Sequence, residues 1–310
     1  MSFSSEVKKE LCAVEVYERE LLRAELYGML LFSKCFKSDK IVFTTESRYA
    51  AKRVTMLLEN LFMPIIEKQN VLRAKSGEAR LYRISLIDSD ECARVFSDFG
   101  HGRDEVTLRV NRANVFSEEL SAAFVRGAFL SCGSVSDPMK SYHAEFSVPF
   151  KNLAADLCKI LGEVTECEFT PKTVLRSGSY VVYFKGSEQI CDLLTYFGAP
   201  IQAMDIMGTK AVKQVRNNVN RRINGEIANI SKIAGASAKQ LEAIHMIQKR
   251  RGLDTLPEDL REIAYLRLEN PEMSLRDLGQ NLSVPISRSG ANHRMQRLLE
   301  YADCAEDSNG

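Results

Sequence analysis

A short segment near the C-terminal end of the chain carries side chains that could read DNA. Between Val284 and Leu299 there are three arginines and no acid, although residues 252–310 contain eleven acids against six arginines. Arginine, asparagine and glutamine hydrogen-bond to base edges and phosphates, so this composition is typical of a DNA-recognition helix. The candidate DNA-contacting residues of this segment are Arg288, Ser289, Asn292, His293, Arg294, Gln296 and Arg297.

The positions of these residues suggest different roles. Arg288 and Asn292 lie at the start of the segment, where side chains can reach base edges, and each bidentate contact discriminates by about 1–3 kcal/mol. We expect Arg294 and Arg297 to hold phosphates, whereas His293 is equally compatible with a packed or capping role. The alternative is a helical hairpin with only a structural role, which would not require the local exclusion of acids.

A second candidate site lies upstream, in a strongly basic segment. Residues 207–251 contain ten lysines and arginines against two acids, whereas the whole chain has a net charge of +1. Concentrated positive charge attracts a polyanion such as DNA, although a solvated helix face or an interdomain spacer is the alternative. Apolar residues recur at helical spacing from Val212 to Ile230, while the asparagines also permit a bend. The candidate DNA-contacting residues are Lys213, Arg216, Asn217, Asn220, Arg221, Arg222 and Asn224.

The elements that would position the C-terminal candidates follow a helix-turn-helix pattern. Pro257 opens one helix with acids in its first turn, and Ser274 can cap a second helix in which Gly279 allows a close approach. After a turn at 283–286, Ser287 can cap the third helix. The residues expected to point inward are Leu275, Leu278 and Leu282 in the second helix, Val284 and Ile286 in the turn, and Ala291, Met295, Leu298 and Leu299 in the third helix.

The first two thirds of the chain contain an internal repeat. Residues 83–100 align with residues 181–198, and each segment reads as a strand followed by a helix that ends on Phe-Gly. Ser89 and Ser187 are the predicted N-caps of these helices, and the final glycines are the predicted left-handed exits. Each repeat opens with a helix that contains a glycine among apolar residues, which favours a close crossing of two helices. The predicted pattern is α-β-β-α-β-β-α, twice.

The second of these glycine-bearing helices resembles a known motif. Residues 124–135, Phe-Val-Arg-Gly-Ala-Phe-Leu-Ser-Cys-Gly-Ser-Val, are similar to the LAGLIDADG helix of homing endonucleases, with Gly127 and Gly133 at its two glycines. In that family an acid before the last glycine of each repeat holds the divalent metals for phosphodiester cleavage. The corresponding positions here are Ser33 and Cys132, which are poor ligands for Mg²⁺. The resemblance therefore implies the fold without the nuclease chemistry, and an endonuclease that recruits metal through Asp137 is the opposing hypothesis.

The nucleases of that family read DNA with a saddle of antiparallel strands. Here residues 41–46 contain no cation and residues 142–148 contain only His143. These strands therefore carry little positive charge for a surface that would bind DNA, and a surface that binds a protein is the alternative.

Taken together, these features resemble the bacterial WhiA family over essentially the whole chain. The resemblance rests on the tandem repeat, the opening Ser-Phe-Ser-Ser-Glu-Val-Lys, and Ser-Leu-Arg-Asp-Leu-Gly followed by Ser-Arg-Ser-Gly-Ala-Asn-His-Arg-Met-Gln-Arg-Leu. It implies a DNA-binding regulator of sporulation in actinobacteria and of cell division or chromosome segregation in Firmicutes. The C-terminal part is also similar to region four of sigma factors.

The sequence thus predicts an α+β protein with several parts. A pseudo-twofold tandem αββαββα LAGLIDADG-like domain is expected over residues 1–205, with repeats at about 17–100 and 117–198. A basic helical connector over 206–252 is followed by an all-α helix-turn-helix domain over 253–303 and a tail over 304–310. The eight cysteines form no CxxC pair and have no His-rich partner cluster, so neither a metal site nor a disulfide framework is expected. No cofactor is expected either.

We expect this chain to be a non-catalytic, sequence-specific transcriptional regulator whose partner is double-stranded DNA. RNA polymerase, another transcription factor and the division machinery are the candidate protein partners, and the alternative function is a DNA-tethered protein adaptor. No apolar run is long enough to span a membrane, and neither a secretory signal nor a small-molecule substrate is expected. The expected location is the cytoplasm, at the nucleoid.

Overall fold

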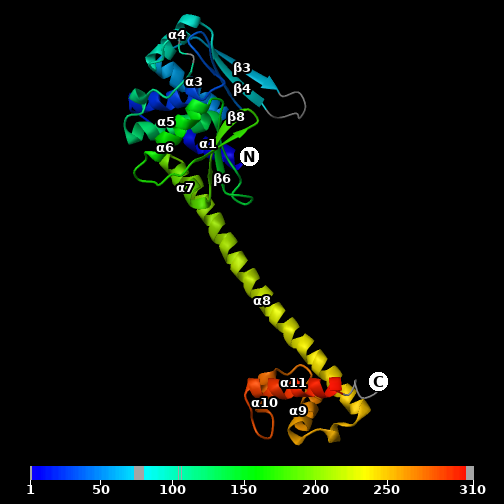
Figure 1. The fold of residues 1–310 in the computed structure, drawn as a ribbon. Helices are drawn as coiled ribbons and strands as arrows, with labels where there is room; N and C mark the ends of the chain where they lie inside the picture. Colours follow the sequence, from blue (N-terminus) through cyan, green and yellow to red (C-terminus); the bar gives the residue numbers. More distant parts are fainter. Residues whose placement is uncertain (1, 73–79, 104, 106, 305–310) are drawn as a thin grey trace. The chain divides into compact units, whose positions relative to one another are not determined.

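The computed structural model describes residues 2–72, 80–103, 105 and 107–304. They form two compact units, one up to residue 213 and one from residue 214 onward (Figure 1). Each unit has a hydrophobic core of its own, and the two are described separately here.

The first unit is built from two repeats with the same order of elements. After α1 (Phe3–Cys12), the first repeat comprises α2 (Arg19–Leu31), β1 (Cys35–Phe36), β2 (Ile41–Thr45), α3 (Arg48–Leu61), β3 (Ile66–Leu72), β4 (Arg80–Leu86) and α4 (Ser89–Asp98). After η1 (Arg112–Asn114), the second comprises α5 (Glu118–Cys132), β5 (Gly133–Val135), β6 (His143–Val148), α6 (Lys151–Gly162), β7 (Lys172–Arg176), β8 (Ser179–Lys185) and α7 (Ser187–Tyr196). The predicted αββαββα repeat is confirmed.

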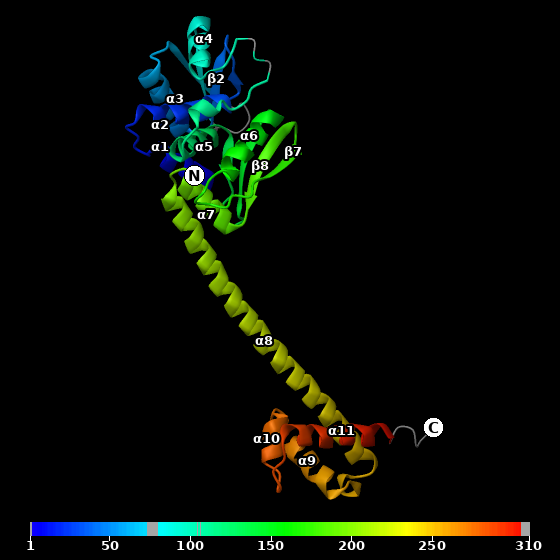
Figure 2. The ribbon, with the colours of Figure 1, turned by 60° about the vertical axis from the view of Figure 1, so that its left-hand side comes forward.

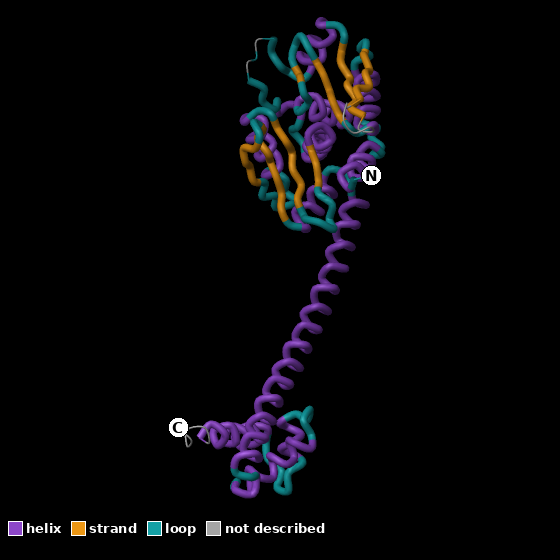
Figure 3. The backbone as a smooth tube through the Cα atoms, turned by 90° about the vertical axis from the view of Figure 1, so that its right-hand side faces the viewer, coloured by secondary structure: helices purple, strands orange, loops and turns teal. Residues whose placement is uncertain are grey.

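Each repeat folds its strands into one antiparallel sheet. The strand orders are β1-β2-β4-β3 and β5-β6-β8-β7, so the two sheets have the same topology. Figure 3 shows them as two separate sets of orange strands. In each sheet an apolar face is buried: Phe43 pairs with Ile84 in the first, and Phe146 pairs with Val182 in the second. The inner faces of both sheets contribute to one continuous core.

The helices α2 and α5 cross at two glycines that face each other's backbone. A Cβ atom on Gly28 would lie 2.1 Å from the carbonyl oxygen of Phe124, and one on Gly127 would lie 2.0 Å from that of Glu25. These distances are far shorter than any real Cβ contact, so only glycine permits this approach. Figure 2 shows the two helices side by side between the blue-cyan first repeat and the green second repeat.

A buried ionic group also joins the two repeats. The Glu25 carboxylate is fully buried and accepts hydrogen bonds from Arg53 at 2.7 and 2.9 Å and from Arg126 at 3.0 Å. Arg53 comes from α3 of the first repeat, whereas Arg126 comes from α5 of the second. Charge-assisted hydrogen bonds of this kind offset the cost of removing three ions from water.

The predicted helix exits are confirmed, but the predicted N-caps are wrong. Gly100 and Gly198 have φ of 79° and 103°, the left-handed region expected after a helix. The cap of α4 is Asp88, whose carboxylate accepts a hydrogen bond from the Asp90 N–H, so Ser89 is already inside the helix. The cap position of α7 is Gly186, with φ of 94°, and it has no side chain to accept a hydrogen bond.

The second unit is entirely helical. The helix α8 (Pro200–Arg250) is continuous, and the predicted boundary between residues 205 and 206 falls inside it. The following elements are η2 (Leu253–Thr255), α9 (Glu258–Glu269), α10 (Leu275–Gln280) and α11 (Arg288–Cys304). The last turns of α8 contribute Ala243, Ile244 and Ile247 to the core that α9, α10 and α11 share, so the end of α8 is a structural part of this unit.

The turn between α10 and α11 is anchored by one of the two residues expected to do so. Ile286 packs against the core, and its N–H donates to the Gly279 carbonyl at 2.9 Å. The inward placement predicted for Val284 is wrong, because its side chain is 69% exposed. Gly279 is needed at this point, since a Cβ there would lie 2.7 Å from the Ile286 carbonyl oxygen.

Candidate nucleic-acid interface

The helix α11 has one buried face and one exposed polar face. Ala291, Met295 and Leu298 are buried in the core of the second unit. The opposite face presents five of the predicted DNA-contacting residues, all exposed: Arg288, Ser289, Asn292, His293 and Gln296. The N-terminus of the helix is capped by the Ser287 hydroxyl, which accepts a hydrogen bond from the Gly290 N–H at 3.2 Å. This arrangement is suited to insertion of the polar face into a DNA groove.

The structure separates Arg294 and Arg297 from that exposed set. Both arginines approach Asp259 in the first turn of α9. The Arg297 Nη1 lies 3.0 Å from the Asp259 Oδ2, and the Arg294 Nη1 donates to the Asp259 carbonyl at 3.4 Å. These two predicted phosphate-binding groups therefore already have an intramolecular anionic partner.

The helix α10 precedes α11, and its N-terminus is capped by a side chain of its own. The Ser274 hydroxyl accepts a hydrogen bond from the Asp277 N–H at 3.2 Å, as the sequence predicts for a capping box. Arg276 and Gln280 are exposed on this helix, and the sequence reasoning missed them. Their signal was their position on the polar side of a short capped helix: Arg276 lies between the apolar residues Leu275 and Leu278, and Gln280 follows Leu278.

A buried arginine shapes the loop between α9 and α10. Arg267 is 2% exposed, and its guanidinium donates to the carbonyls of Asn270, Pro271 and Met273 at 3.4, 3.3 and 2.6 Å. Three backbone acceptors around one charged donor hold the end of α9 in a fixed geometry. Arg267 thus positions α10, and through it α11, without reaching the exposed face.

The basic segment predicted upstream lies on α8. Arg216, Asn217, Asn220, Arg221 and Asn224 are exposed there, as a role in contacting DNA requires. Two other predicted residues have protein partners: Arg222 bonds to Glu226 at 3.1 Å, and the Lys213 ammonium donates to the Pro138 carbonyl at 2.7 Å and lies 5.0 Å from the Tyr142 ring centre.

The apolar side chains of this part of α8 are exposed as well. Their exposed fractions range from 46% for Ile223 to 65% for Ile230. The helical spacing of these residues is therefore real, but it does not reflect burial within either unit.

The degenerate nuclease positions lie at the ends of α2 and α5. Ser33 is buried, and its hydroxyl donates to the Cys35 carbonyl at 3.3 Å. Burial raises the pKa of the Cys132 thiol to about 12, so it stays protonated near neutral pH. Asp137 is exposed beyond the helix, and its carboxylate accepts a hydrogen bond from the Met139 N–H at 2.8 Å. Across the part of the chain that the structure describes, no group of three or more His, Cys, Asp and Glu side chains could hold a metal ion.

The outer face of the second sheet carries more positive charge than β6 alone suggests. Glu145 bonds to His143 at 3.0 Å and to Arg176 of β7 at 2.7 Å. In the same sheet Lys172 pairs with Tyr183, and Lys185 lies 5.4 Å from the Tyr183 ring centre. The sequence reasoning considered only residues 142–148 and missed these cations, because strand pairing brings them together.

Among the described helices, none combines the length and the apolar character that crossing a bilayer requires.

Comparisons with known proteins match both units. Residues 121–216 match the family model of the WhiA LAGLIDADG-like domain, and residues 219–302 match that of the WhiA C-terminal HTH domain. Curated relatives named "Probable cell division protein WhiA" include those of Clostridium botulinum strain Hall, 34% identical, and Clostridium beijerinckii, 35% identical, each alignment covering 98% of both chains. A crystal structure of full-length DUF199/WhiA from Thermatoga maritima is 28% identical with a TM-score of 0.60, and the match covers 98% of each chain.

Proposed function

Because this chain belongs to the WhiA family, we propose that it is a non-catalytic, sequence-specific DNA-binding regulator of genes for cell division, chromosome segregation or sporulation. Its relatives carry the name of cell division proteins, and the matched C-terminal domain is a helix-turn-helix domain. A role of this kind places the protein at the nucleoid, with double-stranded DNA as its partner.

The observation that carries the proposal is the exposed polar face of α11. Arg288, Asn292 and Gln296 share this face, and the side chains opposite them are buried. Arginine pairs with guanine, and asparagine or glutamine pairs with adenine, through two hydrogen bonds each. Arg288 has no ion-pair partner among the described residues, so its guanidinium is available to a base or a phosphate.

The exposed basic side chains of α8 support a separate, sequence-independent contribution. Arg216 and Arg221 are free to approach phosphates, which fix register and orientation without reading bases. Each neutralised phosphate releases about one counterion, so this contribution weakens steeply with salt.

The identities of Ser33 and Cys132 support a protein that binds DNA without cleaving it. A hydroxyl whose hydrogen is donated to a carbonyl, and a thiol that stays protonated, cannot replace a pair of carboxylates as ligands for Mg²⁺.

The test is equilibrium DNA binding over a range of salt concentrations, on specific and random duplexes. We expect Arg288→Ala to weaken specific binding by about tenfold and leave random binding almost unchanged. The double change Arg221→Ala with Arg222→Ala should weaken both equally and reduce the salt slope by about one to two. Equal losses on both duplexes for both variants would refute this division of roles.

A protein-adaptor function is the second candidate, and the edge strand β7 favours it. Val174 and Leu175 are 46% and 61% exposed there, which leaves an apolar edge on the first unit. RNA polymerase, another transcription factor or the division machinery would be the partners. Co-purification of one of these with the wild-type chain, lost in the double variant Val174→Lys with Leu175→Lys, would support this function.

A further inference from the structure

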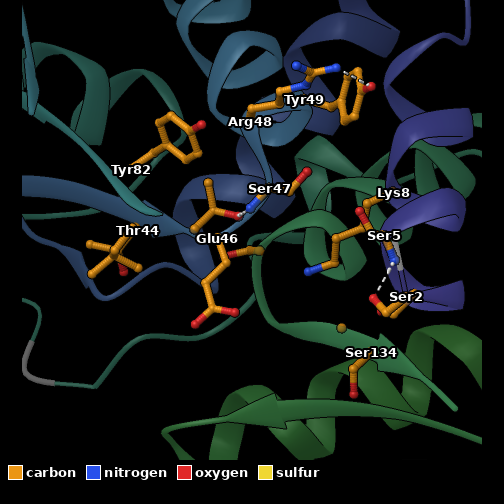
Figure 4. Close-up of a pocket in the computed structure, with 15 residues that line it drawn as sticks. Ser2, Ser5, Lys8, Thr44, Glu46, Ser47, Arg48, Tyr49, Tyr82 and Ser134 are labelled. Carbon is orange, nitrogen blue, oxygen red and sulfur yellow. Dashed lines mark hydrogen bonds between the residues drawn. The ribbon is translucent and has the colours of Figure 1, made fainter. Parts of the chain in front are cut away.

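A polar cleft of about 750 Å³ lies in the first unit, away from the candidate DNA-contacting residues of α8 and α11. It is bounded by the start of α1, the junction of β2 and α3, and the end of α5. Figure 4 shows Ser2, the N-cap of α1, and Ser5 and Lys8 of that helix facing Thr44, Glu46 and Ser47, with Ser134 and Tyr82 nearby. Most of its described lining residues carry a hydroxyl group: Ser2, Ser4, Ser5, Thr44, Thr45, Ser47, Tyr49, Tyr82, Ser131 and Ser134.

The Lys8 ammonium is the central charge of this cleft. It donates one hydrogen bond, to the Leu130 carbonyl at 3.3 Å, and lies 6.0 Å from the Phe129 ring centre. An ammonium has three N–H donors, and within the described residues Leu130 provides its one hydrogen-bond acceptor. Burial lowers the pKa of Lys8, and the carboxylate of Glu46 in the same cleft acts in the opposite direction. A partly desolvated cation with two unused donors is suited to an anionic ligand.

The surrounding backbone also favours a negative charge. Both α1, of ten residues, and α3, of fourteen, begin at this cleft. Their N-caps Ser2 and Ser47 line it, and helix N-termini carry partial positive charge. Arg48 adds a second cation beside one acid, Glu46, in the described lining.

Aromatic side chains lie at the same cleft. The Arg48 guanidinium is 4.8 Å from the Tyr49 ring centre and bonds to the Tyr49 hydroxyl at 2.8 Å. Tyr82, which belongs to β4, also lines the cleft (Figure 4). Aromatic and guanidinium planes are surfaces on which nucleobases stack.

We propose that this cleft binds the phosphate group of a nucleotide, with the Lys8 ammonium and the serine hydroxyls of α1 and α5 as hydrogen-bond donors. The same chemistry is offered by the phosphodiester backbone of DNA and by a free nucleotide. This site goes beyond the proposed function, which assigns DNA to α8 and α11. In a cleaving enzyme, a pair of carboxylates with bound metal would contact the phosphate and activate water. Here the Lys8 ammonium would contact the phosphate instead, and it would not activate water.

The experiment uses the full chain, with labelled double-stranded DNA and a labelled free nucleoside monophosphate as the two probes. Lys8→Met removes the ammonium, and Lys9→Met is the matched control on the same helix, because the Lys9 side chain is 49% exposed and pairs with Glu6. Ser5→Asp keeps Lys8 and adds a carboxylate to the cleft. An acid also suits the first turn of a helix, so this second variant should fold.

For Lys8→Met and Ser5→Asp we expect about a tenfold loss of affinity for at least one probe, with Lys9→Met unchanged. If DNA is the source of the phosphate, the salt slope should also fall by about 0.9 for Lys8→Met. If the source is a free nucleotide, only affinity for the monophosphate should fall.

Unchanged affinity for both probes in folded Lys8→Met and Ser5→Asp would overturn the inference; if Lys8→Met does not fold, Ser5→Asp alone decides. Loss of specific DNA binding in Arg288→Ala together with that result would leave the proposed function standing. If the wild-type chain binds no DNA, the proposed function fails, and the monophosphate alone decides the inference: Lys8-dependent binding supports it and no binding overturns it.

Discussion

We predict that Asp259 competes with DNA phosphates for the guanidinium of Arg297. The two side chains are 3.0 Å apart and are 37% and 39% exposed, so solvent screens their attraction. Such an exposed pair stabilises the fold by at most about 1 kcal/mol. Replacing the carboxylate with the amide of Asn should therefore preserve the fold and release Arg297, while Arg294 keeps its hydrogen bond to the Asp259 carbonyl.

The consequence for DNA binding follows from counterion release. One additional arginine–phosphate contact steepens the slope of log affinity against log salt by about 0.9, which is about a three- to fourfold greater loss between 50 and 200 mM salt. We expect Asp259→Asn to raise affinity at low salt for specific and random duplexes alike. Fluorescence anisotropy titrations at several salt concentrations measure both quantities.

The matched control is Glu258→Gln, which removes the same charge from the neighbouring exposed position in the first turn of α9. Both changes alter the overall field and the helix dipole equally, so only the released arginine distinguishes them. The reasoning is refuted if Asp259→Asn gives the same slope and affinity as Glu258→Gln, or if its affinity is lower than that of the wild type.

Two further predictions concern the first unit, and circular dichroism during urea unfolding measures both, because the chain contains no tryptophan. Gly28→Ala should lower the free energy of unfolding by at least about 2 kcal/mol, since the new Cβ would lie 2.1 Å from the Phe124 oxygen, whereas Gly208→Ala, in open space on a helix, should raise it by up to about 1 kcal/mol. If Gly28→Ala lowers the free energy of unfolding no more than Gly208→Ala does, the close crossing of α2 and α5 is contradicted. Glu25→Gln should cost about 3–5 kcal/mol because it leaves two buried arginines without their anion, while the exposed control Glu20→Gln should change little. Equal effects of these two changes would show that the ionic group contributes nothing.

The repeat and the helix-turn-helix unit were predictable from the sequence because their signals are local. A glycine among apolar residues predicts a close helix crossing at Gly28 and Gly127, and a serine three residues before an acid predicts the cap at Ser274. These patterns depend on residues within one turn of a helix, so no tertiary information is needed. The two predicted N-cap serines failed for different reasons: Asp88 is a stronger acceptor one position before Ser89, whereas α7 starts after Gly186, whose positive φ sets the helix start without a side-chain cap.

The chemistry of the candidate sites was less predictable because it depends on distant residues. The periodicity of α11 places Arg294 and Arg297 beside the polar face, but it cannot show that Asp259, thirty-five residues before Arg294, holds them. Lys8 and Leu130 are separated by 122 residues, and the cleft exists only because α1 packs at the end of α5. Val284 lies in a turn, where burial follows from the backbone path and not from side-chain type.

The central claim is that the protein binds specific DNA without cleaving it, and DNase footprinting in the presence of Mg²⁺ and Mn²⁺ tests it most directly. The footprint reports specific binding, and a sample taken before the nuclease is added shows whether the protein itself has cut the strands. The account predicts a bounded protected segment for the wild-type chain, its loss in Arg288→Ala, and full-length strands throughout. No protected segment on any genomic fragment, or strand scission that purifies with the protein, would contradict it.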